Sequence, residues 1–329
     1  MRLRRSDPAS PGWRRRARGR GFGYTDADGA PLPPDAVARI KALVIPPAWR
    51  DVWVSPHPNG HIQAVGTDAA GRRQYLYHER WRQNRDEEKH DRVLTLAPAL
   101  PAFRRAITAD LRRRGRGRAR VLAVALATLD RGVFRVGGDS YAEDNGTHGV
   151  ATLLCSHVTV HGSEVDFRYP AKGGIEFTTT LEHPDLARAV AALKRAGHPD
   201  ERLLTDSTGH EVASDEVNAR FKELVGDEHT VKDLRTWHAT VSAAVAFARA
   251  DRPSSARARK RLEAEVIREV SELLGNTPAV ARKSYVDPRV VEAFHRGEVI
   301  KKCTGRTLKK CTDRTKAERE VIRLLSQDG

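Results

Sequence analysis

The sequence has few cysteines and no long apolar run, and both shortages limit the kind of protein it encodes. Three cysteines among 329 residues, Cys155, Cys303 and Cys311, do not make a disulfide framework, so a reducing cytoplasm is expected. No apolar stretch approaches the roughly 18 residues of a membrane span, and no signal-peptide core follows the arginine-rich start. We therefore expect a cytoplasmic protein without a membrane partner.

The motifs of metal and nucleotide chemistry are missing as well. The chain has no Walker-type phosphate loop, no His-Glu-x-x-His helix and no nucleophile elbow of a serine or cysteine hydrolase. The Asp26/Asp28 pair lacks the glutamate of a calcium loop, since Val37 stands at the twelfth position, and is predicted to be a hairpin turn. Cys303 and Cys311 have no second cysteine pair with which to hold zinc. We expect no metal, nucleotide or other cofactor.

Positive charge is the strongest compositional signal. The formal net charge is +15 and the isoelectric point about 10.1, which favours a polyanionic partner. Ribosomal, chromatin and membrane-surface proteins share this bias, so the charge indicates a class of partner and no chemistry. Residues 1–21 are rich in arginine, and we expect a flexible basic arm that adds nonspecific phosphate affinity or only keeps the chain soluble.

The spacing of apolar residues divides the chain into β-like and helical parts. Residues 22–90 predict a small antiparallel sheet of four or five strands, followed by a charged segment at 80–92 that is expected to be a linker or to be partly helical. Residues 91–297 predict a mainly helical domain with a small sheet at 152–179, followed by a basic tail at 298–329. The fold class is therefore α+β. The expected helices span 101–114, 119–134, 184–196, 214–225, 232–250, 256–274, 278–285 and 314–326.

Two basic segments are candidates for contact with nucleic acid. The alternating residues 72–77 of the first domain suit a strand lying along a DNA groove, although a half-buried strand has the same pattern. Eight arginines at 104–120 and the lysines of 301–316 are expected to lie along backbone phosphates, or else to be solvated surface.

The stretch 275–285 ends on a single tyrosine. Gly275 is typical of a helix C-terminus, and Thr277-Pro278 predicts the N-cap and first residue of a new short helix. Tyr285 would lie near the end of that helix, next to two basic residues. A phenol so placed is a candidate nucleophile, or an amphipathic tyrosine with its ring on the core.

Three basic residues would complete a set suited to phosphodiester cleavage. Arg135 follows the end of a helix, Lys172 lies at a glycine-flanked hairpin tip, and Arg235 lies in the segment 232–237. When a tyrosine hydroxyl attacks phosphorus, guanidinium groups can stabilise the charge on the phosphate oxygens. A lysine can protonate the leaving 5′-oxygen, so such a set needs no metal.

In this order the motifs resemble type IB DNA topoisomerases, above all their poxvirus-like and bacterial branch. The resemblance covers roughly residues 22–296 and includes 71–77 and 83–85, which look like that branch's DNA-contacting segment. It implies a small N-terminal antiparallel β domain and a mainly helical catalytic domain of the tyrosine-recombinase/topoisomerase IB type. It also implies a cytoplasmic, nucleoid-associated monomer that clamps double-stranded DNA and relaxes positive and negative supercoils through a 3′-phosphotyrosyl intermediate, without ATP or metal.

Residue by residue, the resemblance implies a catalytic set. Tyr285 would be the nucleophile, Arg135 and Arg235 would brace the scissile phosphate, Lys172 would be the general acid, and Lys232 a further basic residue. The implied DNA contacts are Arg72, Arg73, Gln74, Tyr75, Tyr77, Arg85 and Tyr141.

One active-site position departs from the family pattern. Asn276 stands where many relatives have a histidine, but its side-chain amide can also donate a hydrogen bond to a phosphate oxygen, so we expect activity to survive.

Two alternatives remain. Tyrosine recombinases and integrases share the catalytic fold but usually carry histidine at the position of Lys232, and they lack the N-terminal β domain. A basic architectural DNA-binding protein that kept the fold would leave the catalytic set unexplained.

Overall fold

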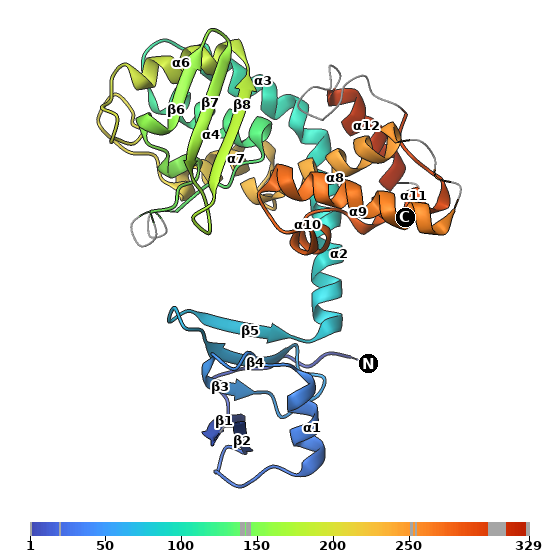
Figure 1. Cartoon of the computed structure of the whole chain (residues 1–329). Helices are drawn as coiled ribbons and strands as arrows, with labels where there is room; N and C mark the ends of the chain where they lie inside the picture. Colours follow the sequence, from blue (N-terminus) through green and yellow to red (C-terminus); the bar gives the residue numbers. More distant parts are fainter. Residues whose placement is uncertain are drawn as a thin grey trace. The chain divides into compact units, whose positions relative to one another are not determined.

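The chain folds into two compact units, residues 1–89 and 90–329 (Figure 1). The structure is a computed structural model, and it describes residues 2–19, 21–138, 142, 146–250, 253, 255–301 and 314–326. The first unit is built on an antiparallel sheet, and the second is mainly helical with a small sheet of its own. The predicted α+β class is confirmed.

The first unit is a five-stranded antiparallel sheet with one helix against it. The strand order is β2-β1-β3-β4-β5, with bounds Trp13–Arg18 (β1), Gly21–Thr25 (β2), Arg50–Val54 (β3), Ile62–Thr67 (β4) and Arg73–Tyr77 (β5). The helix, α1 (Pro34–Ala42), was not predicted, although proline in its first turn is a common helix start. Its residue Ile40 packs on Val52, Val54 and Ala64 to form the small core.

The prediction of a flexible arm over residues 1–21 is wrong for residues 13–18. They form β1, which pairs with both β2 and β3 in the interior of the sheet. The Arg15 guanidinium donates to the carbonyls of Pro46 and Trp49 and lies 4.1 Å from the centroid of the Phe22 ring. An arginine thus occupies an inward position where an apolar residue is usual, which hid the strand's alternation in the sequence.

The charged segment expected as a linker is a continuous helix, α2 (Glu79–Leu96). In the second unit, three strands lie in the order β6-β7-β8, with bounds Val158–His161, Glu164–Pro170 and Glu176–Glu182. Figure 1 shows this sheet beside α4 and α6, and α8 to α12 gathered on the other side of the unit. Its further helices are α3 (Leu100–Leu111), α4 (Arg118–Gly132), α6 (Pro184–Lys194), α7 (Ser214–Val225), α8 (Val231–Arg249), α9 (Ala256–Leu274), α10 (Pro278–Ser284), α11 (Pro288–Arg296) and α12 (Arg314–Leu325).

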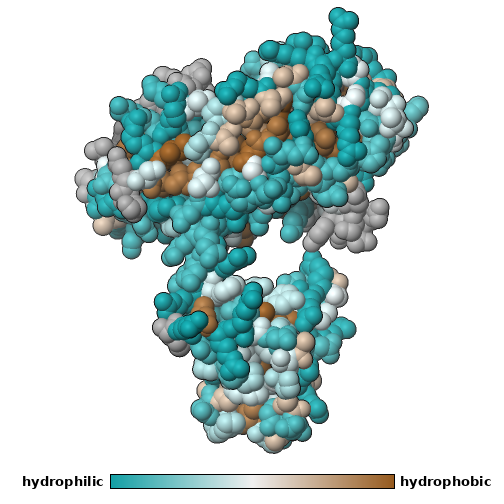
Figure 2. Space-filling model, turned by 180° about the vertical axis from the view of Figure 1, so that it is seen from behind, coloured by the Kyte–Doolittle hydropathy of each residue, from teal (hydrophilic) through white to brown (hydrophobic). Residues whose placement is uncertain are grey.

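Each helix predicted for the second unit is present, and α11 is an addition that the sequence pattern did not reveal. Helix α8 is buried along nearly its whole length, so it is the central element of this unit. The face shown in Figure 2 is mostly hydrophilic, with a band of apolar residues across the larger unit. No helix in the described ranges is both long and apolar enough to cross a membrane.

A buried ion network attaches α12 to the helices around it. Arg104 on α3 lies 2.9 Å from Asp130 on α4 and 2.7 Å from Glu318 on α12. Arg314 contacts the same two carboxylates, at 3.0 Å and 3.2 Å, and also the His238 ring on α8. Burial alone would raise the pKa of Asp130, but the two arginines hold that pKa well below its ordinary value. The expected tail therefore includes a helix that is packed into the second unit.

We expect Asp130→Asn to lower the free energy of unfolding by about 3–5 kcal/mol, because it leaves buried guanidinium charge without its partner. Glu298→Gln is the control, since it breaks an exposed pair with Arg296 that is worth about 0–1 kcal/mol. Urea denaturation of both variants measures the difference. A loss below about 1 kcal/mol for Asp130→Asn would show that the network does not hold α12 in place.

Candidate active site

Tyr285 is positioned by local signals that the sequence displays. Helix α9 ends at Gly275, whose φ of +57° is left-handed, and Thr277 caps α10 by accepting a hydrogen bond from the Val280 N–H at 3.4 Å. Both predictions are confirmed. The Tyr285 carbonyl accepts a hydrogen bond from Thr240 Oγ1 on α8 at 3.3 Å. The backbone of the tyrosine is thereby fixed to the central helix.

Arg235 on α8 joins three segments of the chain at the tyrosine. Its guanidinium donates to the carbonyl of Val133 after α4 and to the carbonyl of Leu274 at the end of α9, the latter at 2.8 Å. Its Cζ lies 5.3 Å from the centroid of the Tyr285 ring. The side chain is buried, and among the described residues its Nε has no hydrogen-bond partner. Burial, with the nearby charge of Arg135, lowers the pKa of Arg235 to about 10.

Arg135 is placed by a tight crossing of two backbone segments. Its carbonyl accepts a hydrogen bond from the Val150 N–H at 2.9 Å, and Gly149 lies directly on Gly137. A Cβ on Gly149 would stand 2.4 Å from the Gly137 nitrogen, so this crossing requires glycine. The crossing fixes the start of the loop that carries Arg135 toward α9 and α10.

Asn276 lies beside Arg135. The Arg135 Nη2 donates to the Asn276 Oδ1 at 2.7 Å and to the Gly275 carbonyl at 3.4 Å. The Asn276 Nδ2 is buried and has no partner among the described residues. Since arginine occupies the amide oxygen, the amide nitrogen is available as a donor at this site.

Lys172 and Lys232 come to the site from different elements. Lys172 is exposed in the β7–β8 turn, where the next two residues, Gly173 and Gly174, have φ of +85° and +73°. Lys232 is the second residue of α8 and, three residues before Arg235, faces the same way. The start of α8 is fixed by Asp233, which accepts from the Thr230 N–H at 2.8 Å and lies 3.0 Å from Arg92.

One open cleft brings the predicted residues together. It has a volume of about 450 Å³, and Arg135, Lys172, Lys232, Arg235 and Tyr285 all line it. Asn276 is connected to it through its hydrogen bond with Arg135. These residues are separated by up to 150 positions in the sequence, and the fold places them around a single hollow. In the ranges described, no group of acidic, histidine or cysteine side chains could hold a metal ion.

The cleft shifts the acidity of the tyrosine. Only 7% of Tyr285 is exposed, and burial alone would raise the pKa of its phenol. The charges of Arg235, Arg135 and Lys232 outweigh that effect and hold the pKa of Tyr285 below its ordinary value. The site therefore makes the phenolic proton easier to lose, which assists formation of the nucleophilic phenolate.

The sequence analysis missed one residue in the cleft, His148, and one beside it, Tyr169. His148 lines it, and its Nδ1 lies 2.6 Å from the Thr152 carbonyl, so Nδ1 carries the proton. Tyr169 packs under Arg135 and Arg235 in an adjoining hollow, and burial raises the pKa of its phenol although both arginines oppose the shift. His148 could have been found from the sequence, because it is a histidine next to a glycine in a loop. Tyr169 had no such signal, since it alternates in a strand as core tyrosines do.

The candidate DNA contacts of the first unit divide into two groups. Arg73, Tyr75 and Tyr77 are exposed on one face of β5, with the tyrosine rings stacked at 5.9 Å and Arg73 5.8 Å from the Tyr75 ring. Arg72 and Gln74 both contact Asp68, at 3.0 and 2.9 Å.

The remaining candidates lie elsewhere. Arg85 is exposed on α2, 3.6 Å from Glu88. Tyr141 lies outside the described residues, as do Cys303 and Cys311.

Most arginines of the segment 104–120 are engaged within the protein. Five of the eight contact a carboxylate or a backbone carbonyl, a role that neither expectation for this segment included: Arg104, Arg112, Arg113, Arg118 and Arg120. For the lysine-rich segment 301–316, residues 302–313 lie outside the described residues.

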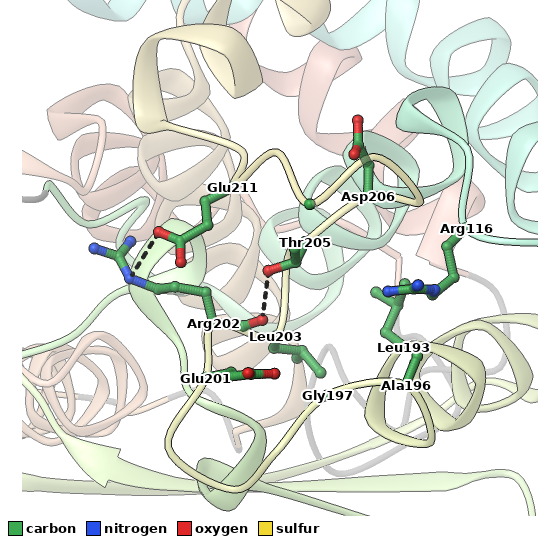
Figure 3. Close-up of a pocket in the computed structure, with 11 residues that line it drawn as sticks. Arg116, Leu193, Ala196, Gly197, Glu201, Arg202, Leu203, Thr205, Asp206 and Glu211 are labelled. Atoms are coloured by element: carbon green, nitrogen blue, oxygen red, sulfur yellow. Dashed lines mark hydrogen bonds and ion pairs between the residues drawn. The ribbon is translucent and has the colours of Figure 1, made fainter.

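A further hollow, of about 320 Å³, lies around the loop between α6 and α7 (Figure 3). It contains none of the predicted catalytic residues, and Arg116 of the arginine-rich segment 104–120 lines it. Within it Arg202 lies 3.9 Å from Glu211, and Thr205 donates to the Arg202 carbonyl at 2.8 Å. Its charged groups include both signs, so it lacks the cationic character of the Tyr285 cleft.

Comparisons with known proteins relate this chain to one family. Residues 78–312 match the family described as eukaryotic DNA topoisomerase I, catalytic core, and residues 21–68 match the bacterial DNA topoisomerase IB N-terminal domain. A DNA topoisomerase 1B of Acanthamoeba polyphaga mimivirus is 30% identical over 269 residues, covering 78% of this chain and 80% of the relative. The DNA topoisomerase 1B of Vaccinia virus (strain Copenhagen) is 22% identical, covering 69% and 71%.

Among solved structures, a XerH site-specific recombinase bound to palindromic difH substrate in a post-cleavage complex aligns at 14% identity. It covers 57% of this chain and 50% of that chain, with a TM-score of 0.36. The two family matches together cover most of the chain, and the mimivirus relative covers 78% of it. The chain belongs to the type IB DNA topoisomerase family.

Proposed function

We propose that this chain relaxes positive and negative supercoils by cutting and resealing one strand of duplex DNA, with Tyr285 as the nucleophile. The observation that carries the proposal is the single cleft in which Tyr285 meets two arginines and two lysines. Family membership supports the reaction class, and the arrangement of the cleft supports the role that we propose for each residue.

In the first step the phenolic oxygen of Tyr285 attacks the scissile phosphorus. A bond forms between that oxygen and phosphorus, the bond from phosphorus to the 5′-oxygen breaks, and the 3′ end of the strand stays on the tyrosine. The lowered pKa of Tyr285 makes the phenolic proton easier to lose. The fixed backbone of Tyr285 limits the number of orientations in which the attack can occur.

Charge that gathers on the nonbridging oxygens is met by preformed donors. Arg235 is held rigidly by two carbonyls, and its Nε has no partner among the described residues. Arg135 lines the same cleft, and Asn276, which accepts a hydrogen bond from Arg135 through Oδ1, keeps its amide nitrogen without a partner among the described residues. Buried donors that need no reorganisation stabilise such a charge more than exposed ones do.

The leaving 5′-oxygen is a strong base and needs a proton as its bond breaks. Lys172 is suited to supply it, because the two glycines after it let the turn carry the lysine to the phosphate. Lys232 adds positive charge near Tyr285 and can return a proton to Lys172. No metal or nucleotide enters this scheme.

Resealing reverses the chemistry. The free 5′-hydroxyl end rotates about the intact strand, attacks the phosphotyrosine and releases Tyr285. The phosphotyrosine bond keeps the energy of the broken phosphodiester, so no ATP is consumed.

In the first unit, the exposed row of Arg73, Tyr75 and Tyr77 offers cationic and aromatic groups to a DNA groove. We also propose that the enzyme acts as a monomer at the nucleoid of a bacterial cytoplasm. The match to the bacterial N-terminal domain supports only the bacterial source.

Asn276 offers a graded test of the phosphate contact. We expect Asn276→Asp to slow cleavage by about 10²–10³-fold, because a donor is replaced by a negative charge facing phosphate. Asn276→His keeps a donor and should stay within about tenfold of the parent. Single-turnover cleavage of a duplex oligonucleotide measures both. Equal rates for the Asp and His variants would contradict the assigned contact.

The proposed function is tested by relaxation of negatively and positively supercoiled plasmid in EDTA without ATP. We expect the parent to relax both forms. If it relaxes neither while still binding DNA tightly, a recombinase awaiting its site or an architectural protein would fit better.

A further inference from the structure

Strand β1 presents three arginines on one side of the sheet. Arg14, Arg16 and Arg18 are exposed, whereas Trp13 and Arg15 between them are partly buried. Cross-strand pairing assigns the faces: Trp13 pairs with Val54, which lies on the α1 side in the core. Side chains alternate along a strand, so Arg14, Arg16 and Arg18 lie on the face opposite α1. We call these three residues the β1 stripe.

The charges of the β1 stripe are not neutralised by the protein. Within the described parts of the chain, none of the three guanidinium groups forms an ion pair or a side-chain hydrogen bond, in contrast to Arg15. Their neighbours on β2 are small, since Arg16 pairs with Gly23, Arg18 with Gly21 and Arg14 with Thr25. No large side chain on β2 therefore covers the guanidinium groups.

The β1 stripe shares its face with the aromatic row of β5. Following the register across the sheet, Arg14 pairs with Trp53, Trp53 with Val65, and Val65 with Tyr75. Directly paired residues point to the same side, so Tyr75 and Arg14 lie on one face. Strands β1 and β5 are three strand spacings apart, or about 14 Å. Between β1 and β5, the Trp53 side chain on this face is packed against the N-terminal segment, because its indole donates to the Ser10 carbonyl at 3.1 Å.

We propose that the β1 stripe is a second DNA-binding surface, which holds the phosphate backbone of the duplex whose groove receives the β5 row. Arg14 to Arg18 span about 14 Å along the strand. One DNA strand presents a phosphate about every 3.4 Å along the axis, so the stripe covers several phosphates. The major groove is about 12 Å wide, so a strand about 14 Å from one that lies in the groove is beyond the edge of the groove, where the phosphate backbone runs.

This surface is a feature of this chain beyond the matched domain. The match to the bacterial N-terminal domain begins at residue 21, after β1 has ended. The inference rests on the duplex-DNA partner of the proposed function. It assigns different roles in DNA binding to the two strands: β5 contacts the groove, and β1 supplies salt-sensitive affinity for phosphate.

The test compares two triple variants that remove the same charge. Arg14→Gln, Arg16→Gln and Arg18→Gln together delete the β1 stripe. The control combines Arg188→Gln, Arg319→Gln and Arg323→Gln, which are exposed arginines of the second unit. Both are made on a Tyr285→Phe background so that no covalent complex forms. Fluorescence anisotropy with a duplex oligonucleotide gives the dissociation constant over a series of salt concentrations, and thermal unfolding checks that both variants are folded.

We expect deletion of the β1 stripe to reduce the slope of log affinity against log salt concentration by about 2 to 3, since each phosphate contact contributes about 0.9. The control should change that slope by less than about 1. Equal slopes for the two folded triple variants would overturn the proposal. The binding assay needs no catalysis, so its result is independent of the relaxation test. If deletion of the β1 stripe lowers the slope as expected but the parent does not relax plasmid, the proposed function is rejected and the proposal for the β1 stripe is retained. A slope change with duplex RNA as large as that with DNA would reject the role of β1 beside a DNA major groove.

Discussion

Replacing Tyr285 by phenylalanine is expected to abolish DNA cleavage, by at least about 10⁴-fold, while duplex binding stays within about twofold. The change removes only the hydroxyl, which is the nucleophile in the proposed reaction. The ring remains in place because its position depends on Arg235 and on the backbone bond from Thr240. Single-turnover cleavage and anisotropy binding on the same duplex separate the two effects.

Tyr169→Phe is the matched control, since Tyr169 is also buried beside Arg135 and Arg235 but lies in the adjoining hollow. This variant should keep measurable cleavage. If Tyr285→Phe still relaxed plasmid, or if the two variants lost activity equally, Tyr285 would not be the nucleophile.

The second large effect concerns Lys172. We expect Lys172→Ala to slow cleavage by about 10²–10⁴-fold when the leaving group is an ordinary 5′-oxygen. A substrate with sulfur at the 5′-bridging position has a leaving group of low pKa that needs no proton. On that substrate the same variant should cleave at nearly the rate of the parent.

Lys172→Arg distinguishes proton donation from charge. Arginine keeps the positive charge but holds its proton too tightly to act as an acid. It should therefore stay slow on the oxygen substrate and be fast on the sulfur substrate. Equal losses on both substrates for the alanine variant would exclude Lys172 as the general acid.

The local geometry of Tyr285 could be predicted because its signals lie within eleven residues. A left-handed glycine, a threonine cap and a proline at the first helical position each act on the nearest turn of chain. The meeting of Tyr285 with Arg135 and Arg235 could not be derived in this way. It depends on hydrogen bonds across about 40 to 140 positions, such as Arg235 to Leu274 and Arg135 to Asn276, and only the family resemblance anticipated it.

The predictions for the charged segments that differ from the structure do so for a common physical reason. Charge density favoured a flexible arm for residues 13–18 and a linker, at most partly helical, for 80–92, yet both segments form regular structure. In β1 the inward arginine is satisfied by loop carbonyls instead of an apolar core. In the segment 104–120, Arg104 is neutralised by Asp130 and Glu318, which are 26 and 214 positions away. Such partners are tertiary, so the arginine-rich pattern alone does not reveal them.

The most direct test of the account is to trap the covalent complex and identify both of its ends. The parent is incubated with a duplex carrying a label at the cleaved strand, the reaction is stopped with detergent, and the adduct is digested and sequenced by mass spectrometry. We predict that the peptide containing Tyr285 carries the nucleotide through a 3′-phosphate, and that the released strand has a 5′-hydroxyl. An adduct on another residue, or a 5′-phosphate link, would contradict the account.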